Sequence, residues 1–166
     1  MGVPGYLLDS NHVTALFERN VRVIAKLKSI SINQVRACVI TLGEIEAGHK
    51  MTTTTNQDKR NEYTRFVSET FLPNVIKVSE NTRLCYAEIL GEIWKMNPPP
   101  HKKKTERHLV DLGVDINDVW IAAVAMEHGL TLVTTDKMDC IRRATGGKLS
   151  FDNWVSDLPA TPSAPS

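Results

Sequence analysis

Four acidic residues stand near the ends of short apolar runs: Asp9, Glu44, Asp118 and Asp136. Carboxyl ends of parallel strands meet at one edge of a sheet, so at least Asp9, Glu44 and Asp136 are expected to converge. Several carboxylates placed together repel one another unless a hard cation lies among them. Mg²⁺ or Mn²⁺ prefers oxygen ligands and keeps bound waters, one of which can attack a phosphodiester. The spacing therefore favours a metal-dependent hydrolytic site.

Each acid also has a purely structural explanation. Asp9 can cap the helix that follows it, and the helix dipole favours an acid at position 118. Glu44 comes three residues after Thr41, which is the spacing of a T-x-x-E capping box. Asp136 can be a turn acid. Two neighbouring acids can also replace a member of the set: Asp115 and Asp139. The coincidence of four acids, more than any single one, favours catalysis.

The elements that must position these acids alternate along the chain. Apolar runs predict strands at 6–9, 35–40, 75–78, 130–134 and 149–151. Helical spacing of apolar residues predicts helices at 10–17, 21–30, 41–51, 63–71, 80–94, 117–128 and 141–144. Such alternation favours an α/β fold, with a parallel sheet covered by helices on both faces.

Composition excludes several classes of protein. The chain has 166 residues, enough for one domain, and a net charge of +1 from 20 basic and 19 acidic residues. That balance excludes a simple polybasic nucleic-acid binder. Three cysteines without CxxC spacing argue against a disulfide framework or a zinc site. No apolar run approaches the ~20 residues of a membrane helix, and the N-terminus lacks the pattern of a signal peptide, so a cytoplasmic protein is expected.

Three blocks of the sequence resemble the PIN-domain family, and specifically the VapC and FitB toxins of bacterial toxin–antitoxin pairs. Residues 7–11 (LLDSN) look like the family's LLDTN motif, and residues 39–45 (VITLGEI) look like its ITxxEL motif. Residues 116–136 look like NDxxIAAxAxxxGxxLVTxD, which is the most specific block. Ser10 replaces the usual Thr. The resemblance implies a three-layer α/β/α domain over residues 6–155, with a central, mostly parallel sheet of four to five strands.

Known PIN domains are metal-dependent ribonucleases, so the resemblance implies the site. It assigns the metal, Mg²⁺ or Mn²⁺, and its activated water to Asp9, Glu44, Asp118 and Asp136. It implies that Asn11 orients Asp9 by hydrogen bonding, with Thr41 and Thr134 in similar supporting positions. It further implies an RNA substrate, a small cognate antitoxin and a homodimer. Residues 1–5 are then expected to be a leader, and residues 156–166 a flexible tail.

Cations near the acids are the expected contacts to RNA, because phosphates dominate its affinity. The candidates are Lys102, Lys103, Lys104, Arg142 and Arg143. His12, three residues after Asp9, is expected to face solvent from a helix, and Trp154 to lie in the core or in an interface.

Two other functions remain open from the sequence. A phosphoacceptor receiver domain also uses acids at strand ends with Mg²⁺, although Asp9 is not followed by a second acid and no Lys follows the last strand. A PIN scaffold with weak catalysis, acting as a binding and autoregulatory module, is the third possibility.

Overall fold

The computed structural model describes residues 5–52, 56–100 and 105–156, and its centre is a parallel sheet. The four strands lie in the order β2-β1-β3-β4, and every pair is parallel. Their bounds are β1 Tyr6–Leu8, β2 Val35–Arg36, β3 Thr131–Val133 and β4 Phe151–Asp152. The short strands give the sheet one well-defined carboxyl edge.

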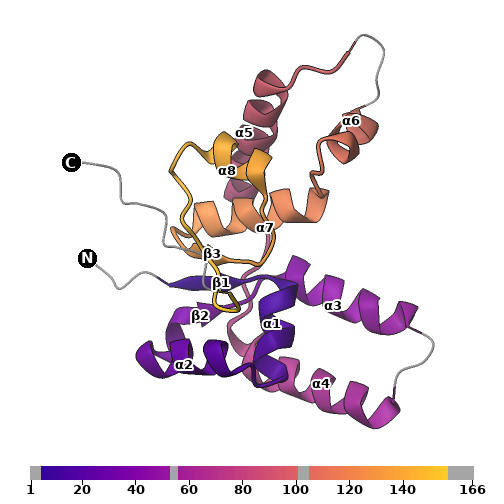
Figure 1. Cartoon of the computed structure of the whole chain (residues 1–166), viewed down its shortest axis with the longest axis vertical. Helices are drawn as coiled ribbons and strands as arrows, with labels where there is room; N and C mark the ends of the chain where they lie inside the picture. Colours follow the sequence, from indigo (N-terminus) through magenta and orange to yellow (C-terminus); the bar gives the residue numbers. More distant parts are fainter. Residues whose placement is uncertain (1–4, 53–55, 101–104, 157–166) are drawn as a thin grey trace.

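Helices cover both faces of this sheet (Figure 1). Below it in the view lie α1 Ser10–Phe17, α2 Val21–Ser29, α3 Val39–Met51 and α4 Gln57–Thr70. Above it lie α5 Glu80–Met96, α6 Thr105–Asp111, α7 Ile116–Glu127 and α8 Asp139–Thr145. The three-layer α/β/α architecture and the parallel sheet of four strands confirm the predicted fold class.

Two hydrophobic cores hold the layers together, one on each face of the sheet. Successive strand residues point to opposite faces, so Leu7 joins the core beneath α5, α7 and α8, whereas Leu8 joins the core beneath α1 to α4. Leu132 and Val133 of β3 repeat this division. All four side chains are fully buried. The central strands are therefore fixed on both sides, and so are the residues that follow them.

Two predicted strands are wrong in extent, for one shared reason. The apolar run 35–40 pairs only at Val35–Arg36, because the chain turns into α3 at Val39. The run 75–78 follows the short 3₁₀ turn Leu72–Asn74 and forms only an isolated parallel bridge, between Ile76 and Cys38. Since its partner leaves the sheet at once, this run has nothing further to pair with. Periodicity alone cannot separate a short strand from the first turn of a buried helix.

The observed helix caps decide whether Glu44 and Asp118 have a capping role. Helix α3 begins after Cys38, with Thr41 already inside it, so Thr41 and Glu44 do not form a capping box. Helix α7 is capped by Asp115, whose carboxylate accepts from the Asn117 N–H at 2.7 Å. Asp118 is therefore not the cap. Helix α5 is capped by Ser79, whose Oγ accepts from the N–H groups of two residues in its first turn.

None of the helices in the described part of the chain is long and apolar enough to cross a membrane. The expected leader and tail lie outside the described residues, except for Gly5 and Ser156.

Candidate active site

The site lies where the order of strands reverses. From β1 the chain proceeds to β2 on one side, whereas β3 pairs with β1 on the other side. Crevices at such switch points, outside the carboxyl ends of the strands, are the usual ligand sites of open α/β sheets. Asp9 follows β1 directly and its N–H donates to the carbonyl of Val133, the last residue of β3. The acids that follow these two strands are thereby held side by side.

Asp9 is the most buried of the four acids, with only 3% of its surface exposed. Its Oδ1 accepts two hydrogen bonds from His12, from the backbone N–H at 2.9 Å and from Nδ1 at 3.1 Å. Its Oδ2 is buried and has no hydrogen-bond partner among the described residues. A buried carboxylate oxygen without a donor is costly unless another positive group meets it.

Asp118 lies in the first turn of α7, and the charges of the other acids raise its pKa. Its pKa is raised from 3.8 to about 7, first by burial and then by four neighbouring carboxylates: Asp115, Asp136, Glu44 and Asp9. Like charges raise a pKa in this way only over short distances or in a poorly screened environment. All four predicted acids therefore share one electrostatic neighbourhood.

Glu44 joins the same neighbourhood from α3. Burial raises its pKa, hydrogen bonds from the side chains of Asn117 and Ser10 oppose that rise, and the charges of Asp115 and Asp9 add to it. These two donors come from α7 and α1, so Glu44 lies where three helices meet. Its position owes nothing to helix capping.

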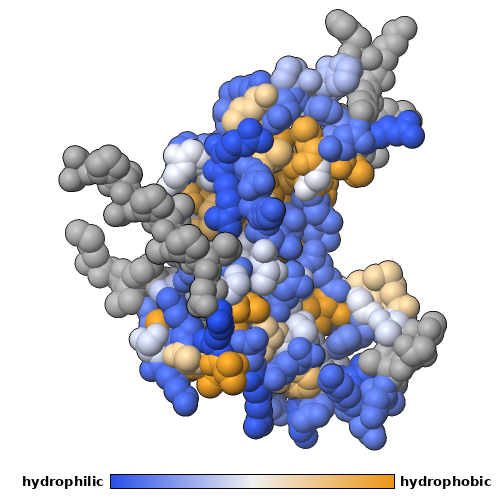
Figure 2. Space-filling model, in the orientation of Figure 1, coloured by the Kyte–Doolittle hydropathy of each residue, from blue (hydrophilic) through white to orange (hydrophobic). Residues whose placement is uncertain are grey.

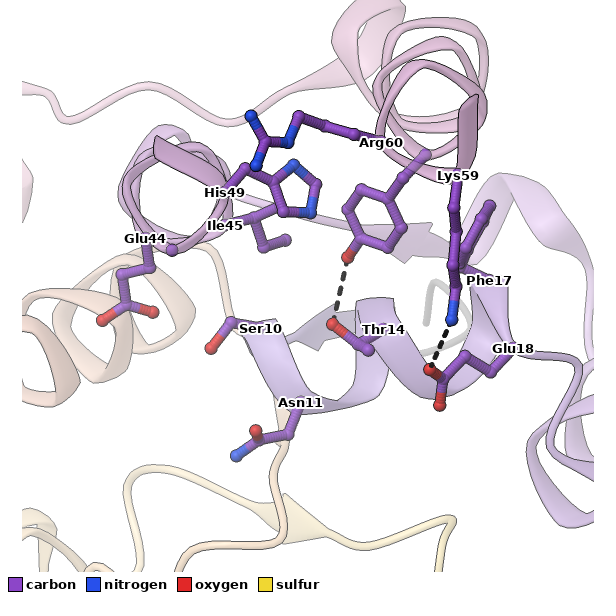
Figure 3. Close-up of a pocket in the computed structure, with 12 residues that line it drawn as sticks. Ser10, Asn11, Thr14, Phe17, Glu18, Glu44, Ile45, His49, Lys59 and Arg60 are labelled. Atoms are coloured by element: carbon purple, nitrogen blue, oxygen red, sulfur yellow. Dashed lines mark hydrogen bonds and ion pairs between the residues drawn. The ribbon is translucent and has the colours of Figure 1, made fainter. Parts of the chain in front are cut away.

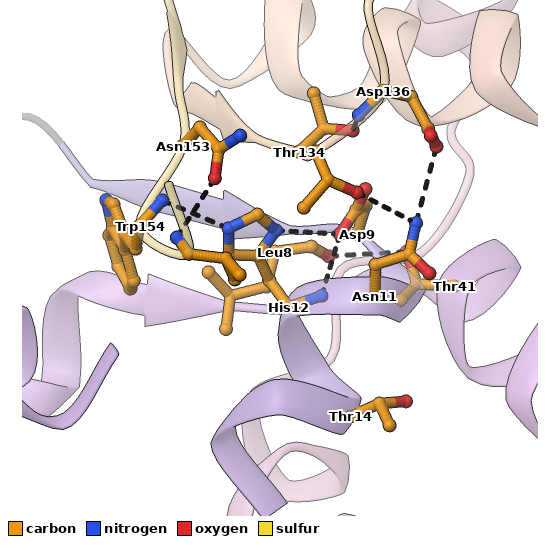
Figure 4. A network of polar contacts seen from close by, with 12 residues as sticks. Leu8, Asp9, Asn11, His12, Thr14, Thr41, Thr134, Asp136, Asn153 and Trp154 are labelled. Carbon is orange, nitrogen blue, oxygen red and sulfur yellow. Dashed lines mark hydrogen bonds and ion pairs between the residues drawn. The ribbon is translucent and has the colours of Figure 1, made fainter. Parts of the chain in front are cut away.

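Asp136 follows β3 and is held by two supporting residues. Its N–H donates to Thr134 Oγ1 at 3.0 Å, and its Oδ2 accepts from Asn11 Nδ2 at 3.4 Å (Figure 4). Burial and the charge of Asp9 raise the pKa of Asp136. Asn11 Nδ2 therefore donates to Asp136, and also to Thr135 Oγ1 at 3.2 Å. The side chain that hydrogen-bonds Asp9 is His12, not Asn11.

Two residues near Asp9 depart from expectation or refine it. Thr41 is fully buried and its Oγ1 donates to the carbonyl of Leu8 at 3.4 Å, so it fixes the end of β1. His12 is also fully buried, and the prediction that it faces solvent is wrong. Its Nε2 accepts from the backbone N–H of Trp154, whose ring packs edge-on against it. The sequence holds no local signal for this contact, because the partners are 142 positions apart.

The residues present fit a hard divalent cation held partly by water. Within residues 5–52, 56–100 and 105–156, no three His, Cys, Asp or Glu side chains close into a metal cage. The observations that fit are the buried, unpartnered Oδ2 of Asp9 and the mutual rise in pKa of the surrounding acids. Mg²⁺ is commonly held by one or two carboxylates and several waters, and such a site does not need a cage of protein ligands.

Two separate hollows border the acids. The first, of about 340 Å³, lies between α1, α3 and α4 and borders Ser10, Asn11 and Glu44 (Figure 3). Its far end carries aromatic and basic side chains: Phe17, His49, Lys59, Arg60 and Tyr63. The second, of about 370 Å³, lies between the loop before α7 and the start of α8, and its lining includes Asp118, Asp136 and Lys137. In Figure 2 the outline of the molecule narrows between the part carrying α5 and α6 and the part carrying α3 and α4.

The expected RNA-binding cations are only partly placed. Lys102, Lys103 and Lys104 lie outside the described residues. Arg142 donates to the carbonyl of Lys137 at 2.7 Å and lies over the Phe151 ring at 4.0 Å, and Arg143 donates to its own helix. Neither arginine lines the second hollow, whereas Lys137, which the sequence analysis did not single out, does.

Comparisons with known proteins agree with this fold. A model of the PIN domain matches residues 6–146. FitAcB from Neisseria gonorrhoeae is similar in structure at 25% identity and a TM-score of 0.65, covering 89% of this chain and 96% of that chain. VapBC-1 from nontypeable Haemophilus influenzae is similar at 23% identity and a TM-score of 0.62, covering 91% of this chain and 98% of that chain. VapBC2 from Rickettsia felis, bound to a DNA fragment from its promoter, is similar at 19% identity and a TM-score of 0.60. It covers 90% of this chain and 98% of that chain. No curated protein matches the chain.

Proposed function

Because this chain belongs to the PIN-domain family, we propose that it is an endoribonuclease toxin that hydrolyses RNA phosphodiester bonds with Mg²⁺ or Mn²⁺. The observation that carries the proposal is the gathering of Asp9, Glu44, Asp118 and Asp136 at the carboxyl edge of β1 and β3. The PIN domains of VapC toxins are nucleases, and the structural neighbours come from VapBC and FitAB toxin–antitoxin complexes.

The residues that would hold the cation are Asp9, through its unpartnered Oδ2, together with Asp118, Glu44 and Asp136. A bound Mg²⁺ or Mn²⁺ supplies an activated water and offsets negative charge on the phosphate. Burial and the neighbouring acids raise the pKa of Asp118 to about 7, so this carboxyl would have to release its proton in order to hold a cation. Thr41 and Thr134 keep the ends of β1 and β3 in place while this occurs.

The two hollows support a polymeric substrate. An extended strand that passes from the hollow of α1, α3 and α4 to the hollow beside α8 crosses the acids on its way. Lys59 and Arg60 at one end and Lys137 at the other place positive charge along this path, as a phosphate backbone requires.

Cleavage of RNA by variants tests the proposal. Asp9→Asn and Asp118→Asn are expected to lose at least about 100-fold in rate with Mn²⁺ or Mg²⁺, beyond the 10–100-fold typical of residues that only orient a ligand. Asp58→Asn, an exposed acid in the first turn of α4, makes the same charge change away from the site and should cleave like the parent. Unchanged cleavage in both site variants would sink the assignment, and cleavage of DNA at the same rate would contradict the RNA substrate.

A cognate antitoxin is part of the same proposal, supported by the complexes in which similar chains are found. Co-expression with the small protein encoded beside this gene should abolish RNA cleavage, and persistent cleavage by a stable complex would contradict this. The homodimer stays a prediction, which sedimentation velocity checks.

The two other functions are weighed by the same results. A PIN scaffold with weak catalysis requires that the parent bind cations poorly, and the intact set of acids argues against it. The receiver domain has lost its support, because the chain belongs to another family.

A further inference from the structure

His12 and the C-terminal end of the domain form a chain of hydrogen bonds that terminates on Asp9. The imidazole is fully buried, so its ring nitrogens can bond only to protein groups. Nε2 lies 3.1 Å from the backbone nitrogen of Trp154, and Nδ1 lies 3.1 Å from Asp9 Oδ1 (Figure 4). Both contacts are well within hydrogen-bond range.

The direction of these bonds fixes the tautomer of the ring. A backbone N–H can only donate, so Nε2 of His12 must be an acceptor and the ring proton must reside on Nδ1. Nδ1 therefore donates to Asp9 Oδ1. A free imidazole chooses between two tautomers, and here the second bond makes the choice.

The turn that supplies the Trp154 N–H is itself well fixed. Trp154 Nε1 donates to Asp152 Oδ2 at 2.9 Å, and Asn153 Oδ1 accepts from Val155 N at 2.9 Å. The indole is buried and packs edge-on against the rings of Tyr6 and His12. The donor to His12 is thus held by packing as well as by hydrogen bonds.

The consequence falls on the other oxygen of Asp9. Oδ1 takes both of its donors from His12, through the backbone N–H and Nδ1, so the carboxylate cannot rotate without breaking one of them. Oδ2 is then presented at the acids, buried and without a partner among the described residues.

We propose that His12 is a positioning residue: its Nδ1–H, fixed by the Trp154 N–H, holds Asp9 so that Oδ2 meets the divalent cation. This rests on the proposed function for the cation itself. Residues that orient a metal-binding carboxylate typically contribute 10–100-fold to metal affinity. Helix capping alone does not require the imidazole, because the backbone N–H of His12 already occupies Oδ1.

Three substitutions at position 12 separate positioning from packing. The amide nitrogen in His12→Asn is as many bonds from Cα as Nδ1, so it can still donate to Asp9. The amide in His12→Gln reaches as far as Nε2, so it can still accept from Trp154 but leaves Asp9 Oδ1 with one donor. His12→Leu keeps the bulk and removes both bonds. All three variants are expected to lose stability.

The main readout is the dissociation constant for Mn²⁺, measured by electron paramagnetic resonance of the free ion. His12→Asn is expected to bind Mn²⁺ within about threefold of the parent, and His12→Gln and His12→Leu about 10–100-fold more weakly. Urea unfolding of the same proteins supplies their stabilities. Equal affinities in the three variants, or affinities that follow stability instead of the Nδ1 donor, overturn the proposal.

A second readout needs neither metal nor substrate. Nitrogen-15 NMR of the histidine side chains in the metal-free parent is expected to show His12 protonated at Nδ1, and protonation at Nε2 contradicts the proposal. If the split between His12→Asn and His12→Gln appears but the parent cleaves no RNA, the ribonuclease assignment fails and the positioning stands. A parent that binds no Mn²⁺ overturns both.

Discussion

Asp9 divides its two carboxylate oxygens between two tasks. Oδ1 caps α1 and accepts from the His12 ring, whereas Oδ2 faces the other acids without a donor among the described residues. A cap and a metal ligand are therefore not competing explanations of this residue. Asp118, in contrast, is free of the capping role because Asp115 performs it.

The raised pKa of Asp118 predicts a specific dependence of stability on pH. The pKa of Asp118 is about 7 in the folded, metal-free chain and near 3.8 in the unfolded chain. Between pH 3.8 and pH 7 the folded state therefore binds a proton that the unfolded state has lost. The folded state consequently loses stability as the pH rises from about 4 through 7. Asp118→Asn has no carboxyl group to titrate at this position, so its stability should not fall for this reason as the pH rises.

We therefore expect Asp118→Asn to melt about 2–4 °C above the parent at pH 8 in EDTA, roughly 1 kcal/mol once the partial exposure of the group is allowed for. The advantage should shrink toward pH 4. Differential scanning calorimetry at several pH values measures it. A difference in Tm that does not change between pH 4 and 8 contradicts the raised pKa.

At the scale of elements, α7 delivers Asp118 to the site only if its first turn is well formed. The Asp115 side chain accepts from the Asn117 N–H at 2.7 Å and so holds that turn. Its charge also raises the pKa of Asp118. The cap and the charge can be separated, because Asn caps helices about as well as Asp does.

Asp115→Ala is expected to lower the free energy of unfolding by about 1 kcal/mol relative to Asp115→Asn. Both variants remove the same charge, so their difference measures the cap alone. Urea unfolding at one pH gives this difference. Equal stabilities would mean that the Asp115 carboxylate does not hold the start of α7.

Element positions also decide how far the sequence could predict the site. Acids at strand ends converge in any parallel sheet, so Asp9 and Asp136 could be placed from the pattern of apolar runs. The burial of His12 could not, because it depends on the chain returning past α1 at Trp154. The length of β2 could not be predicted from the sequence either. It depends on α3 beginning directly after Cys38, whose pairing partner is Ile76.

For the whole molecule, the site exists only when both layers of helices are in place. Glu44 comes from α3 on one face of the sheet and Asp118 from α7 on the other, with Asp9 and Asp136 between them. The unfolded chain cannot gather these acids. The net charge of +1 also includes this local excess of negative charge, which a bound cation would offset.

Cation binding should therefore stabilise the fold. Mn²⁺ at about 100 times its dissociation constant is expected to add roughly 2.7 kcal/mol, or about 5–10 °C in Tm. Asp9→Asn should lose most of this gain, whereas NaCl at equal ionic strength should not reproduce it in the parent. Thermal unfolding with and without Mn²⁺ checks this, and equal gains in parent and variant would contradict a site at Asp9.

The bond from the Trp154 N–H to His12 also orders events during protein synthesis. A ribosome makes His12 142 residues before its hydrogen-bond partner Trp154. A nascent chain that already contains β1, β3 and all four acids still lacks the donor that fixes the His12 tautomer. The last part of the site to be translated is thus the backbone amide of Trp154, which belongs to no motif. Chains released before residue 154 carry all four acids but lack the hydrogen bond that fixes His12 against Asp9.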